Sequence, residues 1–111
     1  MYVYGAEIEV TYTEPNIAVT GISLSSTATV EVGSTIQLTP TITPSNATNQ
    51  SVTWSSNNTA KATVNSSGVV TGVSAGTAVI TVTTVDGGYT ATCTVTVTTA
   101  VTYDYVLTTS L

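Results

Sequence analysis

Few side chains in this 111-residue sequence could carry out acid–base, nucleophilic or metal chemistry. It contains one cysteine, Cys93, no histidine, and a single Lys or Arg residue against six Asp or Glu residues. A serine triad needs a histidine, a cysteine nucleophile needs a nearby base, and a zinc site needs a cluster of His or Cys residues. We therefore expect no catalytic, cofactor-binding or metal-binding residues, no cofactor, and no enzymatic activity.

Cys93 lies within the clearest alternating segment of the sequence, residues 89–98. There Ala91, Cys93, Val95 and Val97 alternate with threonines, so the cysteine shares one face with apolar residues. A reactive thiol would need a neighbouring base and a lowered pKa, and the only lysine falls on a different predicted strand. The pattern favours a buried, small hydrophobic residue, with a reactive thiol as the alternative.

Paired carboxylates occur only at Glu7 and Glu9, two positions apart on one face of a predicted strand. Such a pair could perform acid–base chemistry or bind calcium, but we favour a solvated strand edge over both. The remaining acidic residues are scattered, so a calcium site would need them to converge by chance: Glu14, Glu31, Asp86 and Asp104.

The charge balance limits the kinds of partner. The net charge is −5, and a chain with one lysine cannot neutralise several phosphates. We therefore expect neither nucleic-acid binding nor attraction to anionic lipid. No run approaches the roughly 20 apolar residues of a membrane span, and the first residues lack the basic and apolar regions of an export signal, so we expect no membrane insertion.

Four asparagines fit the acceptor pattern for N-glycosylation: Asn46, Asn49, Asn57 and Asn65. Asparagine near Thr or Ser is expected by chance in a chain this rich in both residues. We interpret all four as turn residues.

The elements that would position these side chains are strands, because hydrophobicity alternates with a period of two almost everywhere. The longest runs are residues 34–44, with Ile36, Leu38 and Ile42 on one face, and residues 77–84, with Ala78, Ile80 and Val82 on one face. No segment shows a helical stripe, and a hydrophobic fraction of 41% argues against disorder. The shorter candidate strands are residues 19–25, 28–32, 51–56, 61–65 and 69–71.

Turn residues separate these runs. The segment Asp86-Gly87-Gly88, placed between two alternating strands, is a strong hairpin signal. Short strands at this spacing, without helices, predict an all-β fold: a sandwich of about seven strands in two antiparallel sheets, with extra terminal strands.

The sequence also resembles a known family. The motifs that carry the resemblance follow one another in order: Val19-Thr-Gly-Ile-Ser-Leu24, Val32-Gly33-Ser-Thr-Ile-Gln-Leu38, Thr41-Ile-Thr-Pro-Ser-Asn-Ala47, Val52-Thr-Trp-Ser-Ser56, Ala62-Thr-Val64, Gly68-Val-Val-Thr-Gly72 and Ala75-Gly76-Thr-Ala-Val-Ile80, before a final Thr-Val strand. Over residues 19–98 they resemble bacterial immunoglobulin-like domains, group 2. Domains similar to this occur in bacterial surface adhesins of the intimin and invasin type and on phage tail and capsid proteins.

The resemblance implies an Ig-like sandwich in which the segment around residues 28–32 pairs parallel with the last strand. In antibody domains a tryptophan on the third strand packs against an inter-sheet disulfide. A single cysteine excludes an intramolecular disulfide, so we expect packing to replace it, with Trp54 between the sheets against Leu38 and Ile80. An exposed binding aromatic is the alternative for Trp54.

We expect four parts along the chain: an extra strand at residues 1–14 that could end a preceding domain, a linker at 15–18, the Ig-like domain at 19–98, and a C-terminal extension at 99–111. Residues 2–13 and 101–107 alternate like strands but fall outside the Ig-like pattern. We expect them to add to a sheet of a neighbouring domain or subunit, or alternatively to pair with each other.

Two functions fit this reading. The first is a non-catalytic display or spacer module on a phage virion or bacterial cell surface, which mediates weak adhesion or assembly and has neighbouring domains or subunits as partners. The alternative is an adhesin module whose sandwich loops bind a carbohydrate or receptor, with shallow polysaccharide contact through Tyr89 or Tyr103. An exposed aromatic cluster at one pole would favour binding, whereas aromatics confined to the core and termini would favour the spacer.

Overall fold

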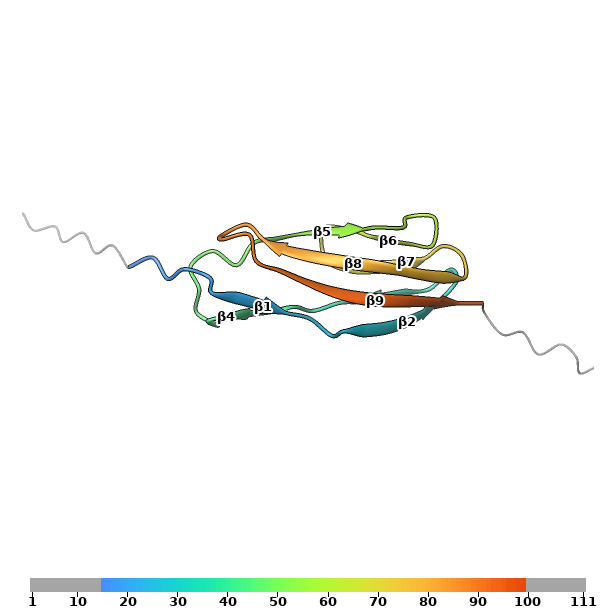
Figure 1. Ribbon diagram of the computed structural model, residues 1–111, viewed down its shortest axis with the longest axis horizontal. Helices are drawn as coiled ribbons and strands as arrows, with labels where there is room; N and C mark the ends of the chain where they lie inside the picture. The colour runs from blue at the N-terminus through green and yellow to red at the C-terminus, as the bar shows by residue number, and fades with distance from the viewer. Residues whose placement is uncertain (1–14, 100–111) are drawn as a thin grey trace, which may run out of the picture.

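The computed structural model describes residues 15–99, which fold into β-strands and connecting loops and contain no helix (Figure 1). The strands within this part are β1 (Gly21–Ser23), β2 (Thr27–Glu31), β3 (Thr35–Gln37), β4 (Thr41–Thr43), β5 (Val52–Ser56), β6 (Ala62–Val64), β7 (Val69–Gly72), β8 (Gly76–Thr84) and β9 (Thr90–Thr98). The abundance of Val, Ile and Thr accounts for the strands, because β-branched side chains pack well on a pleated surface.

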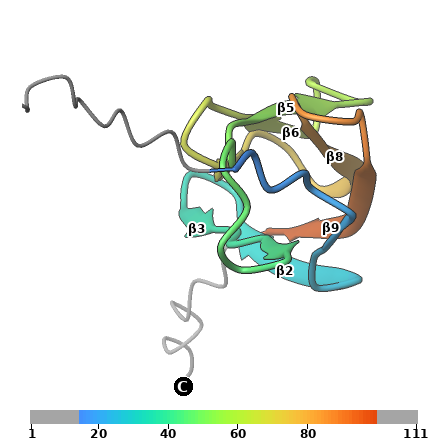
Figure 2. The ribbon, with the colours of Figure 1, turned by 90° about the vertical axis from the view of Figure 1, so that its left-hand side faces the viewer.

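The strands form the two layers of an Ig-like sandwich, as predicted. One layer is a four-stranded sheet in the order β2-β9-β8-β5, which curves around one side of the core in Figure 2. The other contains the β3-β7-β6 sheet and the β1-β4 pair. The β3-β7-β6 sheet and the β1-β4 pair are joined in one layer through β3 and β4, which follow each other along the chain. Ile36, Leu38 and Ile42 of this segment all turn toward the core.

The structure refines the predicted sandwich in two details. The run 34–44 is two strands, β3 and β4, because Pro40 lies between them and proline cannot donate a ladder hydrogen bond. With this split, the eight strand segments expected within residues 19–98 become nine strands. The four-stranded sheet is also mixed rather than antiparallel, since β2 pairs parallel with β9 over residues 27–31 and 94–98. That parallel pairing is the one implied by the family resemblance.

The core lies between the central strands β8 and β9 and the opposite layer. Ile80 pairs with Cys93 and Ala78 with Val95 across the two strands, and all four side chains are buried. Val70 of β7 faces them from the other layer and is also fully buried. The intervening residues of β9 are exposed threonines, so the faces assigned from the alternation are confirmed.

The hairpin between β8 and β9 forms at residues 85–89, where the sequence predicted it. Gly87 and Gly88 adopt positive φ angles of 87° and 68°, which glycine tolerates without steric cost. The buried hydroxyl of Thr84 donates to the Asp86 carbonyl (2.8 Å) and accepts from the Tyr89 N–H (2.9 Å). This buried polar group is thereby satisfied, and it fixes the loop from inside.

The two layers meet closely at Gly72. Its N–H donates to the Ser34 carbonyl (3.0 Å) and its carbonyl accepts from the Gly33 N–H (2.9 Å), so the turn after β2 is tied to the end of β7. A Cβ atom at Gly72 would lie 2.5 Å from the Glu31 carbonyl oxygen and 3.0 Å from Val97 Cγ1. Only glycine lets the two backbones approach this closely.

We predict that Gly72→Ala lowers the free energy of unfolding by about 1–3 kcal/mol, because the added methyl group must displace backbone of β2. Gly21→Ala is the matched control, since a Cβ atom there meets nothing within 4 Å and its φ is not positive. Urea unfolding followed by circular dichroism measures both. Equal stability of the two variants would contradict the close approach at Gly72.

Candidate functional site

The charged residues among residues 15–99 are Glu31, Lys61 and Asp86, and they lie on different strands or turns. This part of the chain holds no group of three or more His, Cys, Asp or Glu side chains that could bind a metal ion, and its surface forms no pocket. Between Pro15 and Thr99 there is also no helix with the length and hydropathy of a membrane span.

Cys93 is fully buried on β9, opposite Ile80 of β8. Burial raises the pKa of the Cys93 thiol because the charged thiolate loses its hydration. A raised pKa and an apolar site are the reverse of what a nucleophile needs. The prediction that Cys93 is a small core residue is confirmed.

Trp54 is a core residue, but less buried than predicted. Its ring packs against the core cluster and stays partly exposed, because β5 is the edge strand of its sheet. A Cβ atom at Gly68 would lie 2.7 Å from Trp54 Cζ2 and 2.9 Å from the Leu38 carbonyl oxygen. The indole of β5 therefore reaches toward the opposite layer, beside Gly68 and the Leu38 carbonyl, which agrees with the predicted position between the sheets.

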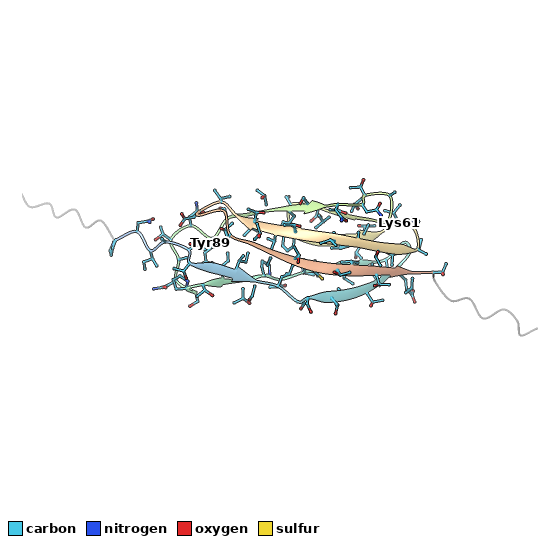
Figure 3. All side chains as sticks on the ribbon, in the orientation of Figure 1. Lys61 and Tyr89 are labelled. Carbon is cyan, nitrogen blue, oxygen red and sulfur yellow. The ribbon has the colours of Figure 1, made fainter. Side chains whose placement is uncertain are left out.

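Tyr89 is the second aromatic residue of the described part, and 41% of its surface is exposed. It follows the β8–β9 turn, at the end of the sandwich opposite to Lys61 (Figure 3). Its ring lies over Gly87. Tyr103, Glu7 and Glu9, the other side chains considered from the sequence, lie outside the described residues. Within residues 15–99 the two aromatic residues form no exposed cluster, because Trp54 packs on the core.

The candidate glycosylation asparagines act mainly as turn residues. The Oδ1 atom of Asn65 accepts from the N–H groups of Ser67 (2.9 Å) and Val69 (3.0 Å), and that of Asn49 accepts from Ser51 N–H (3.0 Å). Asn57 Oδ1 accepts from the Val79 N–H (2.8 Å) and so joins its loop to β8. These three side chains complete backbone hydrogen bonding, as interpreted from the sequence.

The segment that leads into β1 is held by two loops. The Ile17 N–H donates to Thr48 Oγ1 (2.7 Å), and the Thr48 N–H donates back to the Ile17 carbonyl (2.9 Å). Asp86 Oδ2 accepts from the Val19 N–H (3.1 Å), which ties the segment to the β8–β9 hairpin. Sequence reasoning missed this role of Asp86, because partners 67 residues apart become neighbours only in the folded chain.

Val73 and Val85 were also missed. They are 45% and 58% exposed, and with Tyr89 they are the exposed large hydrophobic residues of the described part. The sequence carried a weak signal for Val85: it follows the inward Thr84 and so falls at an outward position, where this chain usually places threonine.

A family model for the bacterial Ig-like domain (group 2) matches residues 18–95. The chain belongs to this family. The match covers the sandwich described above, and it confirms the resemblance drawn from the strand motifs.

Related proteins carry the group 2 Ig-like domain in different settings. The chain is 47% identical over 93 residues to an Ig-like virion protein of Serratia phage KSP90, which is 82% of this chain but 36% of that protein. It is 47% identical over 81 residues to an alpha-L-arabinofuranosidase of Bifidobacterium longum subsp. longum, which is 73% of this chain and 8% of that enzyme. The chain thus spans about a third of the phage protein and a small part of the enzyme.

Among solved structures, an intimin mutant of EHEC O157:H7 is similar, with 27% identity and a TM-score of 0.52 over 63% of this chain and 35% of that one. This likeness confirms the Ig-like fold. The same domain thus occurs in proteins of different activities, so the family alone assigns no chemistry.

We predict that Trp54→Ala lowers the free energy of unfolding by about 3 kcal/mol, the low end for tryptophan truncation, because part of the ring is already in water. Thr53→Ala, at an exposed position next along β5, should cost less than about 1 kcal/mol. Far-UV circular dichroism is the suitable signal, since the variant lacks the only tryptophan. A Trp54→Ala loss no larger than that of Thr53→Ala would exclude a core role.

We predict that iodoacetamide labels Cys93 of the native chain only as fast as the chain unfolds, because the thiol is both inaccessible and protonated. Denatured chain should react at once and serve as the positive control. Mass spectrometry reads the result without ambiguity, since the chain has one cysteine. Fast labelling in native buffer would contradict the inward position of Cys93.

Proposed function

We propose that this chain is a non-catalytic spacer that displays or separates other parts of a larger assembly on a phage virion or bacterial cell surface. Residues 19–98 form the module, and neighbouring domains or subunits are its partners. The relationship to a virion protein and the likeness to intimin support this setting. The spread of the same domain into an arabinofuranosidase, of which it matches 8%, supports a role that is independent of catalysis.

The observation that carries the proposal is the position of the two ends of the described part. Residues 15 and 99, the first and last described, lie at opposite poles of an elongated sandwich (Figure 1). Asp86 of the β8–β9 hairpin binds the Val19 N–H, so the segment before β1 lies at the start of β9. Thr98 lies at the other end of β9, and the nine residues of this strand span about 30 Å. Tension along the chain is therefore transmitted through the whole length of the module.

The parallel β2–β9 pair suits this load. Force toward the N-terminal side draws β2 one way, and force toward the C-terminal side draws β9 the other, so the bonds between them are loaded together in shear. The pair is bounded by hydrogen bonds from Thr94 N–H to the Ser26 carbonyl (2.9 Å) and from Val32 N–H to the Thr98 carbonyl (2.8 Å). Bonds that share a load must break together, which makes a stiff link.

The outer surface also suits an exposed spacer. The outward residues of β9 are threonines, and they pair across the sheet with Thr27 and Thr29 of β2 and with Thr77, Thr81 and Thr83 of β8. Threonine offers hydroxyl groups to water without charge and favours the strand conformation. The single lysine leaves little opportunity for proteases that cut after basic residues.

The alternative, a carbohydrate- or receptor-binding module, receives less support. An exposed aromatic cluster would have favoured it, and within residues 15–99 Tyr89 is the single exposed aromatic residue. The strands predicted for residues 2–13 and 101–107 lie outside the described residues. Their addition to a sheet of a neighbouring domain or subunit stays a prediction.

The proposal predicts a direction-dependent resistance to force. Pulling the N- and C-terminal ends apart in a single-molecule experiment should give one high-force unfolding event, because β2 and β9 shear. As a control, Ser34→Cys provides a handle in the exposed turn after β2, beside the end of β9. Pulling from this handle and the C-terminus should unzip the pair at a several-fold lower force. Equal forces in both directions would refute the spacer function.

A further inference from the structure

The strand β5 is an open edge of the four-stranded sheet and lies along one border of the sandwich in Figure 1. It pairs with β8, and within residues 15–99 no strand pairs with its other side. Directly after β5, the Asn57 N–H donates to the Val79 carbonyl (3.1 Å). Bonding alternates along an antiparallel strand, so the backbone groups of Val52 and Trp54 face away from β8. The open side of β5 therefore presents a row of donors and acceptors.

Nothing in the sequence of β5 blocks pairing at this edge. The strand contains neither proline nor a charged residue, two of the features that usually protect an exposed edge. Val52 and Trp54 lie on its inward face but are only half-buried, whereas the inward residues of the central strand β8 are fully buried. A further strand along β5 would cover the exposed part of Trp54.

Residues 6–13, which we call the N-terminal segment, have the pattern that such a strand needs. Apolar residues alternate with polar ones: Ile8, Val10 and Tyr12 with Glu7, Glu9, Thr11 and Thr13. In an added strand the apolar residues would continue the inward face of β5. The polar residues would continue its outward face, which carries Thr53 and Ser55. The period of two thus fits both faces of the sheet.

The fold brings the end of the N-terminal segment close to the start of β5. Ile17 and Thr48 exchange two hydrogen bonds (2.7 and 2.9 Å). From this contact the chain continues for four residues to Val52 and leads back for five residues to Tyr12, so the two stretches reach about 14 and 17 Å. Val52 pairs with Thr84, so β5 starts at the end of the sandwich that carries the β8–β9 hairpin and runs away from it. The segment runs toward this end, so the two strands would be antiparallel.

Other edges at this end of the sandwich suit the segment less well. A tight hairpin onto β1 would need positive φ angles in its turn, which Pro15 cannot adopt. The N–H groups of Val19 and Thr20 already donate to Asp86 Oδ2 (3.1 Å) and to the Thr43 carbonyl (2.8 Å). The other edge of the four-stranded sheet, β2, is separated from β5 by β8 and β9. β5 is therefore the edge that the segment can both reach and pair with.

We propose that residues 6–13 add to the β5 edge of the chain's own sheet as an antiparallel strand. Tyr12 lies opposite Val52 and Val10 opposite Trp54, so that the added strand covers the half-buried inward face of β5. The sheet then has the order β2-β9-β8-β5 followed by the N-terminal segment. For this segment the proposal names the chain's own sheet, in place of the neighbouring sheet expected from the sequence alone.

The direction of the backbone groups of β5 determines which amides of the segment are bonded. Trp54 turns both of its groups outward, so it exchanges two hydrogen bonds with Val10, the residue opposite. The N–H groups of Glu9 and Thr11 point to solvent. The proposal is independent of the spacer function, because under tension an added strand peels from its free end and leaves the shear of β2 against β9 unchanged.

Hydrogen exchange of the full chain in dilute solution, followed by ¹⁵N NMR, tests the pairing. Relative to their intrinsic rates, the N–H groups of Ile8, Val10 and Tyr12 should exchange at least about tenfold more slowly than those of Glu9 and Thr11. The contrast should persist over an about hundredfold dilution, since both strands belong to one chain. Uniformly fast exchange, or slow exchange of Glu9 and Thr11 instead, would overturn the proposal. Protection that disappears on dilution would also overturn it, in favour of a neighbouring subunit.

Two proline variants test which amides face β5. Val10→Pro removes a donor to β5, so the segment should lose its protection and iodide should quench the fluorescence of Trp54, the only tryptophan, more strongly. Thr11→Pro is the matched control, because an edge strand tolerates proline where the N–H faces solvent. It should keep the slow exchange of Val10 and the quenching of the unchanged chain. Unchanged amide shifts of β9 confirm folding of each variant, and equal quenching of the two would contradict the proposed strand.

Discussion

The parallel pairing of β2 with β9 is the constraint on which the rest of this sandwich depends. After β1, which pairs with β4, the chain crosses to the four-stranded sheet and forms β2 there. It then crosses back to the first layer at the turn that is hydrogen-bonded to Gly72. These crossings connect the two layers at the β2 edge of the four-stranded sheet. Here Ile80, Cys93, Val95 and Val70 pack without any covalent link between the layers.

The central strands could be predicted from the sequence because their alternation is a local property. In β8 and β9 every second residue meets the core, so a period of two identifies both the strand and its buried face. The split at Pro40 was a local signal too, but the alternation continues on both sides of it and conceals the break. The partial exposure of Trp54 depends on β5 being an edge strand, which no local pattern reveals.

The functional features of the chain also divide into those that the sequence alone predicts and those that only the fold reveals. The expectation of no acid–base or metal chemistry comes from counting residue types, whatever the fold. The exposed hydrophobic residues do not follow from counting, because most valines of residues 15–99 are covered and only the fold leaves Val73 and Val85 exposed. The anchoring of Val19 by Asp86 likewise joins two distant parts of the sequence that meet at one end of the sandwich.

The unpaired, buried Cys93 has a consequence for where the chain can mature. A domain held by an inter-sheet disulfide reaches full stability only after oxidation, which restricts its folding to oxidising compartments. This module reaches the same architecture with a protonated thiol, shielded from oxidants by Ile80 and the surrounding apolar residues. Residues 15–99 therefore need no disulfide to reach this fold, so its stability does not depend on whether the surroundings are reducing or oxidising.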